Sequence, residues 1–321
     1  MPTKQTIKRA VRAGTGRKRR RRSRKGRGGR RFFFSMLLIL AFVLLYHFFW
    51  EDIAERFGFG TTTFTTLYDG EIMVSFIDVG QGDAILIRSR DNAVLIDGGE
   101  HSARNAVLNY LRSAGVRSLC YVVATHPHSD HIGGLVTVLG RLDVDMVVMP
   151  DVTHDTNTFE RFLQVIDNND IPVKFPEPGD ILQAGIISLT VIAPPNPHPG
   201  PATNLNNASI VLRLAHGQNS FLFTGDGERE LENWMVNSGI DISANVLHVG
   251  HHGSRTSTTE AFLEGVNPSA AVISLGYNNR HGHPHREVMD RLNARNIRIY
   301  RTDHLGTIRM ITDGQNISLL R

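Results

Sequence analysis

The chain has 321 residues, of which 41% are hydrophobic and 21% charged, a composition that suits one large folded domain or two small ones. Its formal charge of +4 conceals a strong segregation, because residues 1–31 hold fifteen Lys and Arg and no acidic residue, which leaves −11 for residues 32–321. The single cysteine, Cys120, excludes an intramolecular disulfide, and we expect it to be a small buried apolar residue of a core strand. No short-period repeat is present, which argues against a solenoid.

Residues 32–50 form an uncharged and strongly apolar stretch. Its 19 residues, at a rise of ~1.5 Å each, nearly span the ~30 Å hydrocarbon core of a bilayer. Tyr46 and Trp50 stand at its far end, where aromatic side chains favour the interface. We predict that this stretch is a single-pass anchor in the cell membrane. Basic residues beside a membrane span remain on the cytoplasmic side, so the basic tail, residues 1–31, is expected in the cytoplasm and the rest of the chain outside. A cleaved signal peptide is the alternative.

The tail contains the run RKRRRRSRK at residues 17–25. A polybasic segment beside a membrane is attracted to anionic lipid and fixes the topology, so we expect anionic membrane lipid as its partner. Binding to nucleic acid is the alternative for this run.

Residues 51–70 lack an apolar period and are typical of a linker, whereas residues 71–321 have the pattern of one compact domain. Short apolar runs between Gly, Asp or Asn turns predict strands at residues 72–79, 84–87, 93–97, 119–124, 143–150, 209–214, 220–224, 245–249 and 270–275. Capping signals and helical periodicity predict helices at residues 103–114 after a Ser102 cap, 158–168, 228–237 and 287–294. His or Asp recurs where a strand ends, which indicates two βα-rich halves that face each other across one cleft.

The most informative stretch of the chain is the loop at residues 125–131, which reads THPHSDH. It places four potential metal ligands within six residues, namely His126, His128, Asp130 and His131. A buried parallel strand is predicted before this loop and a helix after it, so the ligands lie at the crevice where α/β sheets place their chemistry. Imidazole and carboxylate suit zinc, manganese or iron, and ligands that alternate along a turn can point at two adjacent ions. A polar surface loop is the alternative.

Five further motifs narrow the interpretation: DVGQGD at residues 78–83, TGD at 224–226, HHGS at 251–254, GHPH at 282–285 and YRTDHLGTI at 300–308. Together with THPHSDH, they resemble the metallo-β-lactamase superfamily and, within it, the hydrolase domain of ComEC-type DNA-uptake proteins. The resemblance covers residues 71–321 and implies an α/β fold, a four-layer αββα sandwich with a two-metal site between its sheets. It does not extend to the multi-helix channel of full competence proteins, because a single membrane segment is predicted here.

The resemblance implies two divalent metal ions, manganese or zinc, as cofactors. It implies a ligand set that comprises His126 and His128 for the first ion, Asp130 and His131 for the second, Asp226 as a bridge between the ions, and His251 as the last ligand of the second. Two such ions lower the pKa of a bound water and hold the attacking and leaving oxygens of a phosphoryl group. Asp130 is also the candidate general base, and Asp97 is expected to orient ligands from behind.

One feature departs from the family pattern. Many members of the superfamily place a third histidine for the first ion about twenty residues before the bridging aspartate, but residues 204–209 read NLNNAS. We expect the amide of Asn206 or Asn207 to approach the metal or the substrate instead. An amide oxygen is a harder and weaker ligand than imidazole, which favours manganese or magnesium over zinc. His216 is discounted, because it falls in a predicted hairpin turn.

Six residues flank the ligands within the motifs and are candidates to contact the substrate or to support the ligands from behind: Asp78, Asp83, His252, Ser254, His283 and His285. For Asp83, Ser254, His283 and His285 the sequence also leaves a purely structural role open. Of these, His283 is the candidate to bind a phosphate oxygen or to protonate the leaving group. Its alternative is a polar residue ahead of a helix that begins at Pro284. For Asp83 the alternative is the cap of a turn, and for Ser254 it is the cap of a helix.

These observations favour an extracytoplasmic, membrane-anchored, metal-dependent phosphodiesterase that acts as a DNA nuclease, with DNA as its substrate and a separate DNA-uptake channel protein as a possible partner. The acidic charge of residues 32–321 opposes the binding of a polyanion, unless local arginines supply the field. One alternative is a small-substrate metallohydrolase that cleaves a cell-wall phosphodiester, a nucleotide or a lactone. The other is a non-catalytic binding component of a DNA-uptake assembly.

Overall fold

The structure is a computed structural model that describes residues 66–320. The predicted basic tail, the predicted anchor at residues 32–50 and most of the predicted linker lie outside the described residues. Within the part of the chain that is described, no helix is both long enough and apolar enough to cross a membrane.

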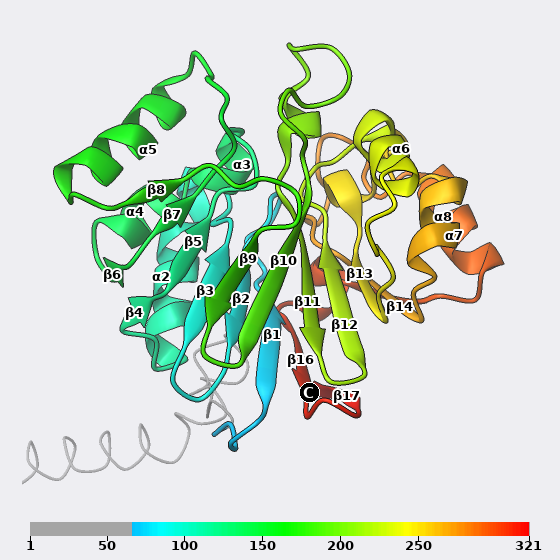
Figure 1. The fold of residues 1–321 in the computed structure, drawn as a ribbon, viewed down its shortest axis with the longest axis horizontal. Helices are drawn as coiled ribbons and strands as arrows, with labels where there is room; N and C mark the ends of the chain where they lie inside the picture. The colour runs from blue at the N-terminus through cyan, green and yellow to red at the C-terminus, as the bar shows by residue number, and fades with distance from the viewer. Residues whose placement is uncertain (1–65, 321) are drawn as a thin grey trace, which may run out of the picture. The chain divides into compact units, whose positions relative to one another are not determined.

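Two β-sheets face each other at the centre of the described domain (Figure 1). The eight-stranded sheet has, in spatial order, β17 (Ile317–Leu320), β16 (Ile308–Thr312), β1 (Ile72–Phe76), β2 (Ile85–Arg88), β3 (Ala93–Ile96), β5 (Tyr121–Val123), β7 (Val147–Val148) and β8 (Val173–Lys174). The seven-stranded sheet has β15 (Arg298–Arg301), β14 (Ala270–Ile273), β13 (Val246–His248), β12 (Asn219–Phe223), β11 (Val211–His216), β10 (Ile187–Ala193) and β9 (Ile181–Ala184).

The pairing within each sheet changes from antiparallel to parallel along its width. Strands β3, β5, β7 and β8 are parallel, as are β12, β13, β14 and β15, whereas the other pairs in both sheets are antiparallel. Parallel neighbours end at the same edge of a sheet, so the loops after these strands gather there.

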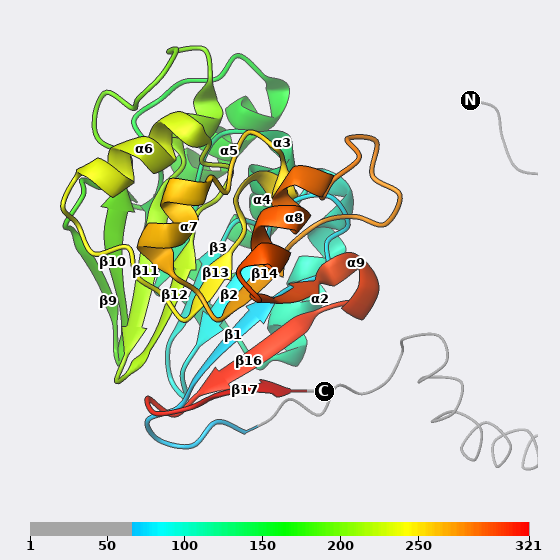
Figure 2. The ribbon, with the colours of Figure 1, turned by 90° about the vertical axis from the view of Figure 1, so that its right-hand side faces the viewer.

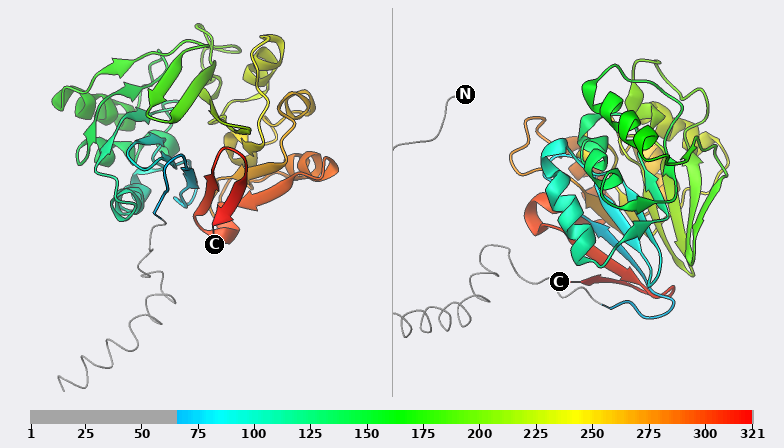
Figure 3. Two further views of the ribbon diagram at one scale, coloured as in Figure 1. Left: turned by 60° about the horizontal axis from the view of Figure 1, so that its bottom comes forward. Right: turned by 90° about the vertical axis from the view of Figure 1, so that its left-hand side faces the viewer.

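Helices cover the outer faces of both sheets (Figures 1 and 3). The first sheet packs against α2 (Arg104–Ser113), α3 (Ser129–Ile132), α4 (Leu135–Leu139) and α5 (Asn157–Asn168) through one apolar cluster. The second sheet packs against α6 (Arg229–Asn237), α7 (Glu260–Val266) and α8 (Arg286–Ala294) through another. The remaining helical turns are η1 (His101–Ala103), η2 (Leu205–Ala208), η3 (Gly250–Gly253) and α9 (Thr302–Leu305). The predicted four-layer αββα sandwich is confirmed.

A third apolar cluster fills the space between the two sheets. Phe76 of β1 meets Phe223 of β12 with ring centroids 6.2 Å apart, and both rings are buried. Burial of an aromatic side chain of this size contributes roughly 1.5–3 kcal/mol. This packing holds the ends of β1 and β12 together, and the loops that follow them carry the functional residues.

Several elements differ from those predicted from the sequence. The strand predicted at residues 119–124 is divided into β4 (Ser118–Leu119) and β5, because β4 pairs with β6 (Asp143–Val144) in a separate two-stranded sheet. Cys120 lies at this break and is half-buried rather than buried. The predicted Ser102 cap is wrong, since the carboxylate of Glu100 accepts the backbone N–H of His101 at the start of η1.

A buried carboxylate links α6 to the start of α7. Glu232 is 2% exposed, and its side chain accepts the backbone N–H groups of Thr258 and Thr259, the second at 2.9 Å. Burial raises the pKa of Glu232, and these hydrogen bonds oppose the rise.

We expect Glu232→Ala to lower the free energy of unfolding by about 2 kcal/mol, because two amides in the interior would lose their acceptor. Urea denaturation of the full chain measures the change. Glu264→Ala, on the exposed side of α7, serves as the control and should alter stability by less than about 0.5 kcal/mol. Equal stability of both variants would contradict this role for Glu232.

Candidate metal centre

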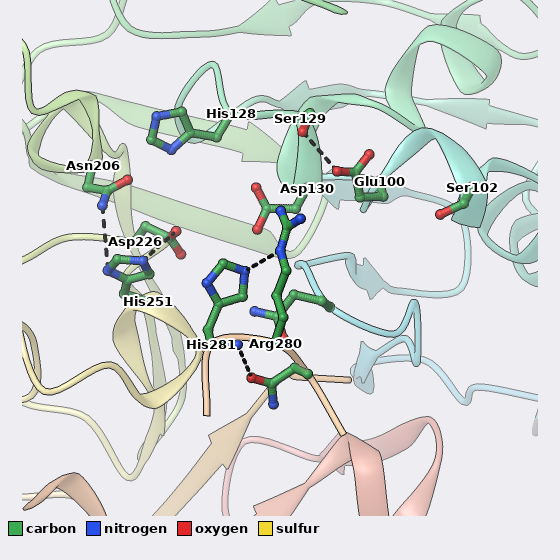
Figure 4. Close-up of a pocket in the computed structure, with 12 residues that line it drawn as sticks. Glu100, Ser102, His128, Ser129, Asp130, Asn206, Asp226, His251, Arg280 and His281 are labelled. Atoms are coloured by element: carbon green, nitrogen blue, oxygen red, sulfur yellow. Dashed lines mark hydrogen bonds and ion pairs between the residues drawn. The ribbon is translucent and has the colours of Figure 1, made fainter. Parts of the chain in front are cut away.

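The predicted ligands lie in loops that follow strand ends in both sheets. His126 and His128 follow β5, Asp226 lies in the turn after β12, and His251 and His252 belong to η3 after β13. Figure 4 shows side chains from these loops converging on one cleft. Residues more than a hundred positions apart in the sequence therefore meet at the edge where parallel strands of the two sheets end.

One group of possible metal donors consists of His126, His128 and Asp226, and we call it the first donor set. One ligand atom from each residue lies within 4.8 Å of the others. Nε2 of His126 is 3.0 Å from Nδ1 of His128 and 3.6 Å from Oδ2 of Asp226. Burial lowers the pKa of both histidines, which keeps the rings neutral, the form in which imidazole binds a metal.

A second donor set consists of Asp130, His131, Asp226 and His252, again with one ligand atom each within 4.8 Å. Nε2 of His131 lies 3.3 Å from Oδ1 of Asp226, and Nε2 of His252 lies 3.5 Å from the same oxygen. Nε2 of His252 is also 3.3 Å from Oδ2 of Asp130. The two oxygens of Asp226 thus face different donor sets, as expected for a bridging carboxylate.

The chemistry of the second set fits a divalent cation. Nε2 of His131, Nε2 of His252 and Oδ1 of Asp226 are buried, and none of them has a hydrogen-bond partner. Buried polar atoms without partners are costly, and a shared cation would satisfy all three at once. Four ligands about 2.1 Å from a tetrahedral ion lie about 3.4 Å from one another, close to the separations of the second donor set. The residues present therefore suit the group that the fold implies.

Asp97 contacts a histidine of the second set on the side that faces away from Asp226. Its Oδ2 lies 2.8 Å from Nδ1 of His131, and its two oxygens accept the backbone N–H and the hydroxyl of Thr125 at 2.8 and 2.7 Å. Asp97 has a φ of 56°, a left-handed conformation that aspartate tolerates. Fixing Nδ1 of His131 directs Nε2 toward Asp226, which is how carboxylates orient metal-binding histidines.

Asp83 lies beside the second set rather than serving only as a turn cap. Its Oδ1 is 3.3 Å from Nδ1 of His252 and 3.5 Å from Nε2 of His248, a residue of β13 that the sequence did not single out. The segment that carries Asp83 passes very close to the ligand loop, since a Cβ on Gly82 would lie 2.2 Å from the backbone oxygen of Asp130. Glycine is the one residue that this approach permits.

The assignment of His251 to the second set needs correction. In the structure His252 takes that place, and His251 lies at the cleft with Nδ1 3.1 Å from Oε1 of Glu228 and Nε2 3.7 Å from Oδ2 of Asp226. Both histidines have left-handed φ values, 49° and 53°, so η3 turns sharply and directs the neighbouring rings differently. A sequence motif with two adjacent histidines carries no sign of this turn.

The two candidate asparagines have different surroundings. Asn206 lines the cleft, its Nδ2 donates to Oε1 of Glu228 at 3.2 Å, and its buried Oδ1 has no hydrogen-bond partner. Asn207 instead donates to Glu230 at 3.1 Å and accepts the backbone N–H of Glu228 at 3.0 Å. The structure therefore favours Asn206 as the amide that faces the metal or substrate, and gives Asn207 a structural role.

Three flanking residues make local contacts rather than facing the donor sets. Asp78 is exposed and accepts the backbone N–H of Gly80, which caps a turn. The hydroxyl of Ser254 lies 2.9 Å from that of Thr256. His285 is the residue before α8, and its Nδ1 accepts the backbone N–H of Arg255 at 3.0 Å.

His283 lies close to the donor sets without belonging to them. Its ring centroid is 5.6 Å from that of His251 and 6.2 Å from that of His252, and its Nδ1 is buried without a partner. Burial, followed by the positive charge of His252 and His251, lowers the pKa of His283 to about 3. The ring is therefore neutral near pH 7 in this arrangement and can donate an N–H to a phosphate oxygen.

The donor sets open into a cleft of about 590 Å³. Its lining includes the sequence-predicted residues His128, Asp130, Asn206, Asp226 and His251, and also Arg280, one of the local arginines near the motifs that could supply a positive field. The residues of the lining that sequence reasoning missed are Gln81, Glu100, Ser102, Ser129, Asn279 and His281. A volume of this size accommodates a ligand as large as a nucleotide.

Glu228 is another functional residue that sequence reasoning missed. It accepts hydrogen bonds from Asn204 at 2.7 Å and Thr256 at 2.8 Å, in addition to its contacts with Asn206 and His251. Burial alone would raise the pKa of Glu228, but these hydrogen bonds lower it to about 2, so the carboxylate is ionised. The only sequence signal was its position directly after the GDG turn, where it was taken as the first residue of a helix.

Comparisons with known proteins agree with this geometry. Residues 77–277 match the family model described as the metallo-beta-lactamase superfamily. The chain is 34% identical over 253 residues to ComE operon protein 3 of Bacillus subtilis (strain 168), which covers 73% of this chain and 32% of that protein. It is 30% identical over 244 residues to competence protein ComA of Neisseria gonorrhoeae, with coverage of 75% and 32%. The chain thus spans about a third of the length of these relatives.

Among solved structures, the metallo-beta-lactamase fold protein YhfI from Bacillus subtilis superposes with a TM-score of 0.50 at 16% identity, over 75% of this chain and 99% of that chain. This likeness supports the fold. The resemblance to ComEC-type competence proteins, inferred from the motifs, is confirmed by the relatives. On the match over residues 77–277, the chain belongs to the metallo-β-lactamase superfamily.

Proposed function

We propose that this chain is a metal-dependent phosphodiesterase that cleaves DNA. The observation that carries the proposal is the position of Asp226, whose Oδ1 faces one donor set and whose Oδ2 faces the other. Two divalent ions bound there, manganese or zinc, would activate a water molecule and hold the oxygens of the phosphoryl group in line for displacement.

Residues of the chain supply the proton transfer and the binding of the phosphate. The side chain of Asp130 is 27% exposed and reaches the cleft. Burial would raise its pKa, but His131 and His252 hold the pKa well below its ordinary value, so the carboxylate is ionised. A base this weak would accept a proton only from a water molecule whose own pKa is lowered by bound ions. The ring of His283 lies beside His251 and His252, and its buried Nδ1 has no partner, so it would donate an N–H hydrogen bond to a phosphate oxygen. Its low pKa leaves the ring unprotonated near pH 7, so it does not protonate the leaving group.

The assignment of DNA as substrate is supported by the relatives, one of which is named a competence protein. We further propose that residues 32–50 anchor the chain in the membrane, with residues 1–31 against anionic lipid in the cytoplasm and the hydrolase domain outside. This placement rests on the apolar stretch and the distribution of Lys and Arg. A separate channel protein would then carry the DNA across the membrane.

A metal-reconstitution assay tests the proposal. The full chain is purified in detergent, stripped with EDTA and reloaded with manganese or zinc, and its metal content is measured by elemental analysis. We expect two ions per chain and metal-dependent cleavage of DNA, which the double variant with His128→Ala and Asp130→Ala should lack. If the reloaded protein leaves both single- and double-stranded DNA intact, the nuclease assignment is wrong.

The charge of the cleft favours one alternative, a hydrolase of small phosphodiesters. The lining contains three carboxylates, Glu100, Asp130 and Asp226, and a single Lys or Arg, which is Arg280. Such a lining is a weak counterion for a long polyanion. Hydrolysis of bis(p-nitrophenyl) phosphate or of a nucleotide, without cleavage of DNA, would support this alternative.

A further inference from the structure

The loop that joins β14 to α8 forms one wall of the metal cleft. We call residues 276–285 the docking loop, and three of its side chains, Asn279, Arg280 and His281, line the cleft. Figure 2 shows this segment, in orange, projecting beyond the N-terminal end of α8. Its position places it beside a substrate that is bound at the donor sets.

The docking loop is held in shape by its own hydrogen bonds. Nδ2 of Asn279 donates to the backbone oxygen of His283 at 2.7 Å and to that of Gly276 at 3.1 Å. Its Oδ1 accepts the backbone N–H groups of His281 at 3.2 Å and His283 at 2.9 Å. A loop fixed in this way can present its side chains without a large ordering cost on binding.

Arg280 is the cation that this loop presents. Within the described residues its guanidinium donates to Nε2 of His281 at 3.2 Å and has no carboxylate partner within ion-pair distance. Two other arginines near the motifs are paired, since Arg301 binds Asp303 at 2.6 Å and Arg286 lies 3.4 Å from Asp290. Figure 4 shows the Arg280 side chain among the residues that line the cleft. An exposed guanidinium without a carboxylate is suited to a phosphate.

Tyr277 is the aromatic residue of the same loop. It is 75% exposed, more than any other large hydrophobic residue in the described chain, and it lies three residues before Arg280. Exposed aromatic rings combined with a nearby cation are the elements with which proteins bind single-stranded nucleic acid, because the ring stacks on an unpaired base.

From this juxtaposition we infer that the docking loop binds the nucleic acid strand beside the cleavage site. Arg280 contacts the phosphate next to the one that is cleaved, and Tyr277 stacks on an unpaired base of the same strand. Both are substrate-positioning residues, and the inference rests on the proposed function because it takes DNA as the substrate.

The experiment compares Arg280→Ala, Arg280→Lys and Tyr277→Ala with the wild-type full chain on a fluorescein-labelled single-stranded oligonucleotide. We expect Arg280→Ala and Tyr277→Ala each to raise KM about tenfold with a smaller change in kcat, and Arg280→Lys to restore part of the loss. Arg280→Ala should also reduce the slope of log KM against log salt concentration by about 0.7, the value for one phosphate contact to a single strand. A change confined to folding would leave that slope unaltered.

Matched controls exist at the far end of the domain. Arg112→Ala removes an exposed arginine from the last turn of α2, and Tyr68→Ala removes an aromatic side chain that is 72% exposed ahead of β1. Both should retain wild-type KM and salt dependence. If Arg280→Ala and Tyr277→Ala also remain within twofold of wild type in both quantities, the inference is overturned.

Binding measured without turnover separates this inference from the proposed function. Fluorescence anisotropy of the same oligonucleotide is recorded with EDTA-treated protein, and we expect about tenfold weaker binding by both docking-loop variants. If the wild type binds the strand through Arg280 and Tyr277 but does not cleave it with any metal, the nuclease assignment fails and the docking role stands. If the wild type cleaves the strand and the variants bind it equally well, the docking role fails alone.

Discussion

Asp226→Asn is expected to abolish the two-metal site. The substitution keeps the size of the side chain but removes the negative charge and one of the two oxygens that face the donor sets. We expect the metal content to fall from two ions per chain to at most one. Hydrolysis should fall by more than about a hundredfold, the upper limit for groups that merely orient ligands.

Elemental analysis and hydrolysis of bis(p-nitrophenyl) phosphate measure the two effects of Asp226→Asn. Asp145→Asn removes an exposed carboxylate and serves as the control, with both quantities expected at wild-type values. A fully loaded and active Asp226→Asn protein would refute the bridging role of Asp226. The thermal midpoint in EDTA shows separately whether the variant is folded.

The second large effect distinguishes the two adjacent histidines of η3. His252 is buried, with its Nε2 3.3 Å from Asp130 and 3.5 Å from Asp226, whereas Nδ1 of His251 is bound to Glu228. We therefore expect His252→Ala to lose one ion per chain and more than about a hundredfold in hydrolysis. His251→Ala should keep both ions.

Elemental analysis after equilibration with manganese at several concentrations measures the occupancy of each histidine variant. A decrease in metal affinity for His252→Ala of at least tenfold relative to His251→Ala would support the structure. The reverse order would restore the assignment that the sequence motif suggested. Because both variants remove an imidazole of the same motif, each serves as the control for the other.

Much of the fold was predictable, because the sequence patterns that mark its strands and helices are local. The strands that became β12, β13 and β14 are short apolar runs that end in Gly, His or Asp, and the structure has them within two residues of their predicted bounds. Strands β9, β10, β16 and β17 were not predicted. In β9, β10 and β16, buried residues alternate with more exposed ones, as in Ile181–Ala184, so these strands lack the continuous apolar run that marks a strand buried on both faces.

The part of the candidate site that the sequence predicts consists of residues that are close together in the chain. One short loop and the helix that follows it carry four of the predicted ligands, namely His126, His128, Asp130 and His131. A helix that begins directly after a strand brings these residues close together, however the other elements of the domain pack. These ligands group around Asp226 only because the two sheets face each other, and that arrangement was predicted from the resemblance to the family.

Other parts of the site depend on conformations that the sequence does not reveal. Asn206 and Asn207 are chemically identical neighbours, and the turn of η2 directs one to the cleft and the other to Glu230. Glu228 and His248 lie in segments whose patterns predict an ordinary helix start and an ordinary strand. Their contacts with His251 and Asp83 join residues that are 23 and 165 positions apart in the sequence.

By itself the sequence determined the class of the protein, the ligand loop and the chemistry of its donors, because ligand type and spacing along one loop are covalent properties. Only the tertiary structure decided that His252, and not His251, joins the second donor set, that Asn206 faces the cleft, and that the loop with Arg280 forms part of its lining. The physical reason is that the direction of a side chain depends on φ, ψ and packing against distant strands, and these are set only when the two sheets come together.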